Sequence, residues 1–331
     1  MAIISETIKL LGANEKEVVK DQFYYGLVQK NVLVTGANGQ LGSELKLFAN
    51  KVNMPFRFFF TDADVLDITS KNDLNEFVVN NNIKYIINCA AYTAVVKAES
   101  DSDKAFDVNV TGVENIALVA KQNGVKVIHV STDFVFDGTS EIAYSEEMKT
   151  NPLSVYGSTK LKGEEALKQM GKDWIIIRTS WLFSEYGENF VKTMLRLMHD
   201  KESLTVVEDE KGSPTYAADL AEMIIHILLF SENKDEWKKG IFHFCNSGEV
   251  TRFDFAKEIK RQAGLNRCEL KRVSSSEFDS LVSRPKYSAL DTSKITAVFG
   301  VKIPTWEDAL ERCLKKINIE LSGFIIMMKN S

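Results

Sequence analysis

Tyr156 and Lys160 stand four residues apart in the segment N-P-L-S-V-Y-G-S-T-K-L-K-G-E (151–164). On a helix that begins after Pro152, their side chains lie on one face, one turn apart. A phenol is a useful acid only if its anion is stabilised, and a nearby ammonium does that. The pair could donate the proton that a ketone takes up when hydride adds to it. Because the chain has nine tyrosines, one Tyr-x-x-x-Lys is also expected by chance, so the surroundings of the pair must decide.

A segment upstream, V-S-T-D-F-V-F-D-G (130–138), supplies a hydroxyl group. Ser131, Thr132 and Asp133 follow the fourth expected strand, and ligands gather at the carboxyl ends of parallel strands. A hydroxyl placed there can orient a substrate carbonyl for hydride addition. Hydroxyl, phenol and ammonium together form the set of groups that carbonyl reduction needs.

Regularly spaced glycines indicate a phosphate-binding turn near the start of the fold. V-T-G-A-N-G-Q-L-G sets Gly36, Gly39 and Gly42 between an apolar run and a helix, one residue longer than the common dinucleotide pattern. Such a turn brings a helix N-terminus to a pyrophosphate, although an ordinary turn remains the alternative. Asp62 ends the next strand twenty residues after Gly42, where it could accept both ribose hydroxyls of an adenosine. Its charge would repel a 2′-phosphate, so the pattern favours NADH and leaves NADPH open.

The next stretch, D-V-L-D-I-T, contains Asp67 and Ile68. These residues could border an adenine edge. An ordinary helix N-cap explains them equally well. Both are therefore candidate cofactor contacts with an open alternative.

Short apolar runs alternate with helix-length segments through the first half of the chain. The runs lie at 31–35, 56–61, 85–90, 125–131 and 174–179, separated by amphipathic stretches such as 103–123. Apolar runs without polar alternation, each followed by a helix, are typical of a parallel sheet buried on both faces. The sequence predicts an α/β fold with a Rossmann-type, doubly wound parallel sheet.

This rhythm also predicts the domain organisation. Residues 1–30 form an N-terminal extension, in which Ile4, Ile8 and Leu11 have helical spacing; a poorly ordered segment is the alternative. Residues 31–180 form the dinucleotide-binding domain, to which a segment at about 212–245 returns. Residues 181–211 and 246–331 form a smaller substrate-binding part. Beyond residue 180 we expect helices at 190–198, 216–230, 251–263 and 305–316, and a strand at 204–207.

The composition excludes some classes of protein. A net charge of −5 over 331 residues argues against a nucleic-acid surface, which needs clustered Lys and Arg. The four cysteines (Cys89, Cys245, Cys268 and Cys313) form no C-x-x-C, so neither zinc site nor disulfide framework is indicated. The N-terminus lacks the pattern of a signal peptide, and the F-I-I-M-M of the tail is too short to span a membrane. We therefore expect a reduced, cytoplasmic protein.

Several ordered motifs resemble one family. V-T-G-A-N-G-Q-L-G-S-E-L, N-C-A-A-Y-T-A-V-V-K-A-E, S-T-D-F-V-F-D-G, Y-G-S-T-K-L-K-G-E, R-T-S-W-L-F, N-F-V-K-T-M-L, G-S-P-T-Y-A-A-D-L-A and R-P-K-Y-S-A-L-D-T occur in the family's order. From about residue 31 to 316 the chain resembles the extended short-chain dehydrogenase/reductase superfamily, and within it the dTDP-4-dehydrorhamnose reductases. The implied reaction is NAD(P)H-dependent reduction of the 4-keto group of dTDP-4-dehydro-β-L-rhamnose to dTDP-β-L-rhamnose.

The resemblance implies a role for each matching residue. Tyr156 is the proton donor, Lys160 its electrostatic partner and a ribose ligand, and Thr132 the hydroxyl. The implied cofactor contacts are Gly36, Asn38, Gly39, Gln40, Leu41, Gly42, Asp62, Asp67, Ile68, Ala90, Ala91, Tyr92, Tyr156 and Lys160. The implied substrate contacts are Thr132, Asp133, Phe134, Trp181, Asn189 and Arg284, the last two at the nucleotide end. Without the resemblance, Trp181 could be core filler and Arg284 a solvated surface charge.

The chain departs from the family pattern at named positions. Val96 stands where the family has an acid in T-A-V-D-K-A-E, and Phe134 where it has a tyrosine. These changes could weaken affinity or mark a related 4-keto sugar nucleotide. Some members bind Mg²⁺ through glutamates at a dimer contact; Glu44 matches one such glutamate but Ala218 replaces another, so no metal is expected. A homodimer is one expectation, and the sequence leaves the oligomeric state open.

Other functions remain alternatives. The regulatory β subunit of methionine adenosyltransferase shares this superfamily and a Tyr-Lys pair without catalysing the reaction. A sugar-nucleotide epimerase or dehydratase would recycle a bound NAD, and Asp133 beside the catalytic threonine keeps the dehydratase in view. The Q-L-G turn, the A-Y-T-A-V segment and the W-L-F stretch resemble the reductases more closely.

Overall fold

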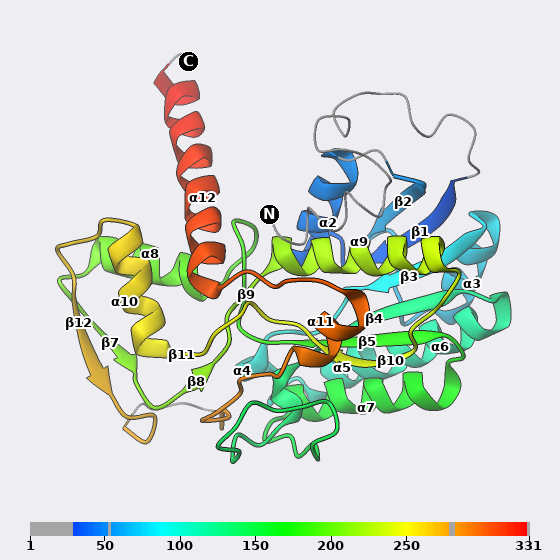
Figure 1. Cartoon of the computed structure of the whole chain (residues 1–331), viewed down its shortest axis with the longest axis horizontal. Coiled ribbons are helices and arrows are strands. Elements are labelled where there is room, and N and C mark those ends of the chain that lie inside the picture. Colours follow the sequence, from blue (N-terminus) through cyan, green and yellow to red (C-terminus); the bar gives the residue numbers. More distant parts are fainter. Residues whose placement is uncertain (1–28, 52–53, 278–281, 330–331) are drawn as a thin grey trace.

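The computed structural model describes residues 29–51, 54–277 and 282–329. Figure 1 shows a sheet-centred body beside a second group of helices and short strands, from which α12 (Trp306–Lys329) projects. The helix expected within the N-terminal extension lies outside the described residues, so that prediction stays untested.

Within the described residues, six parallel strands form the central sheet in the order β2-β1-β3-β4-β5-β10. They are β1 (Lys30–Thr35), β2 (Phe56–Thr61), β3 (Ile83–Asn88), β4 (Lys126–Thr132), β5 (Trp174–Thr179) and β10 (Gly240–His243). Five of them match the predicted apolar runs, and β10 comes from the segment expected to return. The order reverses beside β1, which is where doubly wound sheets bind ligands. The predicted fold class is confirmed.

Helices cover both faces of this sheet, since strand side chains alternate between two apolar clusters. On one face, Val32, Val34 and Ile87 pack with α2 (Gln40–Lys51), α9 (Ala217–Lys234) and α11 (Ser293–Phe299). On the other face, Leu33 and Ile86 pack with α3 (Lys71–Asn80), α6 (Gly112–Asn123) and α7 (Val155–Met170). Figure 1 shows α9 along one side of the sheet and α7 along the other. The continuous apolar strands therefore reflect burial on both faces.

The amphipathic stretch at 103–123 is helical but not one continuous α-helix. After the short helix α4 (Val95–Ala98), it comprises α5 (Ser102–Phe106), a π-helical segment η1 (Asp107–Thr111) and then α6. Insertions of π-helix occur often at functional sites, because they redirect a side chain without ending the helix.

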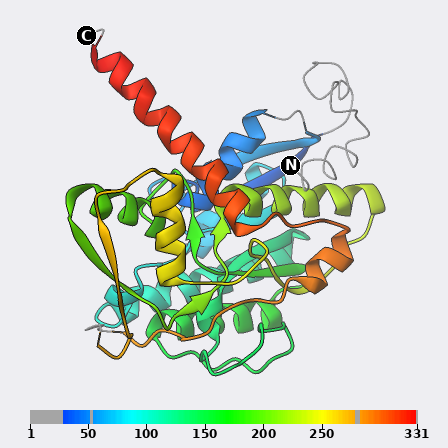
Figure 2. The same ribbon diagram turned by 60° about the vertical axis from the view of Figure 1, so that its left-hand side comes forward.

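A second group of elements packs beside the carboxyl edge of the sheet. Its short paired strands are β6 (Leu182–Phe183) with β9 (Thr215–Tyr216), β7 (Ser203–Val207) with β12 (Glu269–Val273), and β8 (Lys211–Gly212) with β11 (Val250–Thr251). Helices α8 (Phe190–Asp200), α10 (Arg252–Gln262) and the start of α12 share an apolar cluster with them around Phe255. The turned view in Figure 2 shows these helices together on one side of the molecule. The helices and strand expected beyond residue 180 are present at the predicted places.

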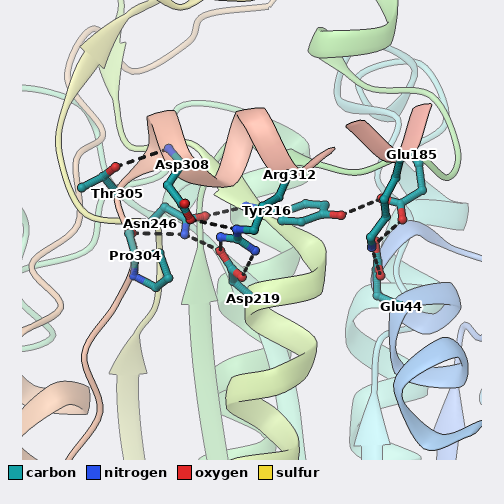
Figure 3. Close-up of polar contacts among 10 residues, drawn as sticks. Glu44, Glu185, Tyr216, Asp219, Asn246, Pro304, Thr305, Asp308 and Arg312 are labelled. Carbon is teal, nitrogen blue, oxygen red and sulfur yellow. Dashed lines mark hydrogen bonds and ion pairs between the residues drawn. The ribbon is translucent and has the colours of Figure 1, made fainter. Parts of the chain in front are cut away.

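The start of α12 is fixed to α9 by a buried charge. Arg312 donates two hydrogen bonds of 2.7 Å to the Asp219 carboxylate, and Asn246 donates another of 2.6 Å to the same group (Figure 3). This bidentate geometry orients the helix as well as holding it.

No helix in the described part of the chain is long and apolar enough to cross a membrane.

Candidate active site

The predicted catalytic pair, Tyr156 and Lys160, lies on α7, whose N-terminus is capped. Ser154 precedes the helix in an extended conformation, and its hydroxyl accepts a 3.1 Å hydrogen bond from the Gly157 backbone N–H. Because this cap starts the helix just after Pro152, Tyr156 occupies the first turn and Lys160 the next. Both point toward β4, whose end carries Thr132. The structure therefore brings the start of α7 against the end of β4.

Tyr156 meets the hydroxyl segment through its phenol and its ring. Thr132 hydrogen-bonds the phenol, and the ring of Phe134, in the 3₁₀ turn η2 (Asp133–Val135), packs edge-on at 5.5 Å between centroids. Burial raises the pKa of Tyr156 to about 12, although the Thr132 hydrogen bond lowers it; Asp133 raises it further. The phenol is therefore protonated at neutral pH, which is the state a proton donor requires.

Lys160 is buried, and its ammonium donates a 2.7 Å hydrogen bond to the Val130 carbonyl. Burial lowers the pKa of Lys160 to about 8, while the charge of Glu164 and Cys89 act to raise it. We expected its ammonium to lower the pKa of Tyr156; in this structure burial of the phenol outweighs any such effect. Lys160 can still stabilise negative charge that develops on Tyr156 during proton transfer.

A buried ion pair anchors the catalytic helix to β5. Glu164 lies one turn beyond Lys160 and accepts hydrogen bonds from Arg178 Nε and Nη2 at 2.9 and 2.7 Å. Both side chains are almost fully buried, at 0 and 3% exposure. The sequence prediction missed this pair. Its signal was present, since the Glu of Y-G-S-T-K-L-K-G-E follows Lys160 at helical spacing.

A second missed residue, Asn109, belongs to the π-helical segment. Its Nδ2 donates to the Thr159 hydroxyl at 3.1 Å and to the Tyr92 carbonyl at 3.2 Å, and its Oδ1 accepts from the Tyr92 N–H at 2.9 Å. Asn109 therefore joins the catalytic helix to the segment after β3, where the nicotinamide path was predicted. A π-insertion is not readable from hydrophobic periodicity, so the sequence carried no usable signal.

The glycine turn has the shape that a pyrophosphate requires. Gly36 has a φ of +66°, and a Cβ on it would lie 2.6 Å from the Ala90 backbone nitrogen, so only glycine fits. Asp62 accepts a 2.9 Å hydrogen bond from the Asn38 N–H and remains accessible to solvent. The turn, Asp62 and Ala90 thus meet at the switch point of the sheet, as predicted.

The remaining predicted cofactor residues have mixed surroundings. Asp67 accepts a hydrogen bond from the Thr69 N–H at 2.8 Å, and the Ile68 side chain is buried in the core. Only the backbone of Ile68 could border an adenine, which hydrophobicity alone could not distinguish. Gly39, Gln40, Leu41 and Gly42 continue the turn into α2, Ala91 follows Ala90, and the Tyr92 hydroxyl donates to Asp101 at 3.1 Å.

The predicted sugar-side residues come from both parts of the chain. Asp133 is buried, and burial raises its pKa to about 6. Trp181 has a left-handed backbone, with φ at +46°, a strained conformation that occurs mostly at functional sites. Asn189 caps α8 and donates to Gln40 Oε1 at 3.0 Å, so it joins the second part of the chain to the glycine turn. Arg284 is exposed.

Glu44, which matches one glutamate of the family's Mg²⁺ contact, already has a cationic neighbour in this structure. Glu44 of α2 and Glu185 lie together, but the Lys316 ammonium is 2.6 Å from Glu185 and 3.5 Å from Glu44. The Tyr216 hydroxyl donates to Glu185 at 3.0 Å, as Figure 3 shows. The Lys316 ammonium already balances the negative charge of this pair of carboxyl groups. The described residues contain no cluster of three or more metal-binding side chains.

The fold and this constellation define a class. A doubly wound sheet with a glycine turn, a carboxylate after β2, and Thr, Tyr and Lys gathered at the end of β4 is that of a short-chain dehydrogenase/reductase. The model of the RmlD substrate binding domain family matches residues 30–319. The chain belongs to this family, that of the dTDP-4-dehydrorhamnose reductases.

Known proteins are similar in sequence to this chain over nearly its whole length. A dTDP-4-dehydrorhamnose reductase of Aggregatibacter actinomycetemcomitans is 40% identical over 286 residues, covering 85% of this chain and 97% of its own. A dTDP-4-keto-6-deoxy-D-glucose reductase of Streptomyces niveus is 34% identical, covering 88 and 98%. The crystal structure of the Bacillus anthracis dTDP-4-dehydrorhamnose reductase in complex with NADP has a TM-score of 0.81 and 36% identity, covering 87% of this chain and 99% of that one.

Proposed function

We propose that this chain reduces the 4-keto group of dTDP-4-dehydro-β-L-rhamnose with NADPH or NADH, giving dTDP-β-L-rhamnose. The observation that carries the proposal is the contact of Tyr156 with Thr132 at the carboxyl end of β4, on the same edge of the sheet as the turn at Gly36. A protonated phenol, a carbonyl-orienting hydroxyl and a dinucleotide turn meet at one edge of the sheet.

The cofactor would be held by the glycine turn and Asp62. The free N–H groups at the start of α2 would face the pyrophosphate, and the Asp62 carboxylate would accept the ribose hydroxyls. When bound, the nicotinamide supplies the hydride that adds to C4 of the sugar. Lys160 would hold the nicotinamide ribose, and Ala90, Ala91 and Tyr92 would line its path.

The protein's part of the reaction is proton delivery. Thr132 would hold the keto oxygen toward Tyr156, which gives up its phenol proton as the carbonyl becomes an alkoxide. Lys160 limits the charge that this transfer leaves on the phenolate, and a proton from solvent restores the phenol. One hydride and one proton thus convert the ketone into the alcohol.

The division of labour between the two parts follows the predicted boundaries. We assign residues 31–180, with the returning segment at about 212–245, to the cofactor, and residues 181–211 and 246–331 to the substrate. The apolar cluster around Phe255 supports this division for α8, α10 and the start of α12, whereas α11 packs on the central sheet. For the quaternary structure we keep the homodimer as a hypothesis, which light scattering of the purified protein tests.

A related 4-keto sugar nucleotide is the second candidate substrate. Phe134 packs on Tyr156 itself, so the exchange of the family's tyrosine removes a hydroxyl beside the reacting carbonyl. Val96, on α4, is 43% exposed and offers no charge. Both changes lie on the sugar side, and the Streptomyces niveus relative is named for a different 4-keto sugar.

The test is to supply each 4-keto sugar nucleotide with NADPH and with NADH and follow loss of the reduced cofactor. We expect turnover with dTDP-4-dehydrorhamnose and formation of dTDP-rhamnose. Faster turnover of dTDP-4-keto-6-deoxy-D-glucose would select the second candidate. Silence of the folded protein with every such substrate would favour the regulatory-subunit alternative.

A further inference from the structure

An arginine that the catalytic constellation does not use lies against Trp181. Arg252 is the first residue of α10, and its guanidinium carbon is 3.4 Å from the centre of the Trp181 ring. The Phe190 ring lies 5.1 Å away from the same carbon. Planar stacking of this kind fixes a guanidinium while leaving its N–H edge free to donate.

The charge of Arg252 is incompletely balanced within the protein. Its Nε lies 3.7 Å from Glu210 Oε2, which is too long for a hydrogen bond, and that buried Nε has no hydrogen-bond partner. Burial lowers the pKa of Arg252 to about 10; Glu210 acts against this, and the charge of Arg284 reinforces it. Arg252 and Arg284 are near enough for their charges to repel, and an anion bound beside them would relieve that repulsion.

Arg252 also lies within reach of the reacting centre. Its charge acts on Asp133, which directly follows the hydroxyl residue Thr132. Gly212 also packs closely on the indole, since a Cβ on Gly212 would come within 2.7 Å of Trp181 Cε2. Close contacts with Gly212 and with the guanidinium therefore both restrict the Trp181 ring.

The proposed substrate has an anion at a matching place. In a nucleotide sugar the phosphate is attached at C1, across the ring from the keto group at C4. A sugar whose C4 meets Tyr156 therefore directs the phosphate on its C1 away from Tyr156. Because Arg252 and Asp133 are close enough for their charges to interact, the Arg252 guanidinium is near enough to the reacting centre to meet that phosphate.

We propose that Arg252, held flat against Trp181, binds the phosphate attached to the sugar, with Arg284 adding to the positive field. The proposal rests on the function proposed above, since it takes the substrate to be a nucleoside diphosphate sugar. It assigns Arg252 to substrate binding and the Trp181 ring to positioning its guanidinium. The competing explanation is that Arg252 only supports the fold through Glu210.

The two explanations differ in what they predict for dTMP, which lacks the phosphate that would be attached to the sugar. The test measures the affinity of dTDP and dTMP by calorimetry for wild type, Arg252→Met, Arg252→Lys and Arg272→Met. Arg272 is the matched control, because it stacks on Phe253 at 4.3 Å and pairs with Glu208 at 3.0 Å, yet is mostly exposed. Thermal unfolding shows whether each variant is folded.

We expect Arg252→Met to weaken dTDP binding by about tenfold to a hundredfold, as loss of a charged hydrogen bond does. Binding of dTMP should change by less than about twofold on the same scale. Arg252→Lys should weaken dTDP binding by an intermediate amount. Arg272→Met should leave the affinities for dTDP and dTMP unchanged. In turnover, Arg252→Met should raise KM far more than it lowers kcat.

Equal losses for dTDP and dTMP, or no loss for either, would overturn the proposal. If the wild type binds neither dTDP nor dTMP, the result contradicts the function proposed above and does not yet test the phosphate contact. UDP and UMP then replace the thymidine pair, and a loss confined to UDP still supports the phosphate contact. A folded wild type that binds no nucleoside diphosphate overturns the phosphate contact as well.

Discussion

Glu164 accepts two hydrogen bonds from Arg178, one helical turn beyond the catalytic lysine. This pair joins α7, which carries Tyr156 and Lys160, to β5, which lies between β4 and the edge strand β10. The charge of Glu164 also acts to raise the pKa of Lys160. The ion pair therefore positions the catalytic helix and favours its cationic lysine.

Removing Arg178 should be costly, because it leaves a carboxylate buried without its partner. We expect Arg178→Met to lower the free energy of unfolding by about 3–5 kcal/mol. Arg261→Met is the control, since Arg261 pairs with Glu258 at 2.6 Å but is 69% exposed, and such a pair contributes about 0–1 kcal/mol. Urea unfolding measures both. Similar small losses in the two variants would refute the buried role of Glu164.

The rate of ketone reduction should fall as pH rises. Burial lowers the pKa of Lys160 to about 8, so its positive charge is present below that pH and lost above it. The Tyr156 phenol remains protonated across the same range, because its pKa is raised to about 12. We therefore expect kcat/KM to decline above about pH 8 as the lysine becomes neutral.

Two variants separate Lys160 from other causes of this decline. Lys160→Met should lower kcat/KM and remove the decline, since no titrating ammonium remains. Lys162→Met, an exposed lysine on the same helix, should keep the wild-type profile. A decline that persists unchanged in folded Lys160→Met would show that another group controls it.

The Glu44 carboxyl should make the protein less stable as pH rises. Burial, with hydrogen bonding and charge from Glu185, raises the pKa of Glu44 from 4.5 to about 8. Burial acts to raise the pKa of Glu185 as well, but hydrogen bonds from Glu44 and Lys316 hold it below its usual value. The shared proton therefore resides on Glu44, and Glu185 keeps the charge that pairs with Lys316.

The direction of this pH effect on stability follows from which state of the protein retains the Glu44 proton. Between pH 4.5 and about 8, the unfolded chain releases the Glu44 proton and the folded chain retains it, so the free energy of unfolding falls as pH rises. Glu44→Gln should flatten this part of the stability profile, whereas Glu188→Gln, an exposed control, should not. Denaturant titrations near both ends of the window measure it. An unchanged slope in Glu44→Gln would mean that Glu44 is ionised in the folded protein.

The elements that hold the site follow local patterns and were predictable. The strands are apolar runs, the Gly36 turn has its own spacing, and Pro152 precedes the helix that carries Tyr156 and Lys160. What could not be predicted depends on contacts between distant segments. Arg178 meets Glu164, and Lys316 lies between Glu44 and Glu185, only after the sheet has brought them together. Trp181 was identified through family resemblance, while its strained backbone follows from no local rule.

The central claim is that Tyr156 protonates the keto oxygen of a dTDP-linked 4-keto sugar. The direct measurement is kcat for dTDP-4-dehydrorhamnose in Tyr156→Phe, with calorimetric affinity for the cofactor and with Tyr85→Phe as control. Tyr85 likewise loses a partly buried hydroxyl, one that contacts Glu232 away from the cleft. We expect Tyr156→Phe to lower kcat by about 10²–10⁴-fold with cofactor affinity retained, and Tyr85→Phe to keep kcat. A folded Tyr156→Phe variant that reduces the substrate at the wild-type rate would contradict the account.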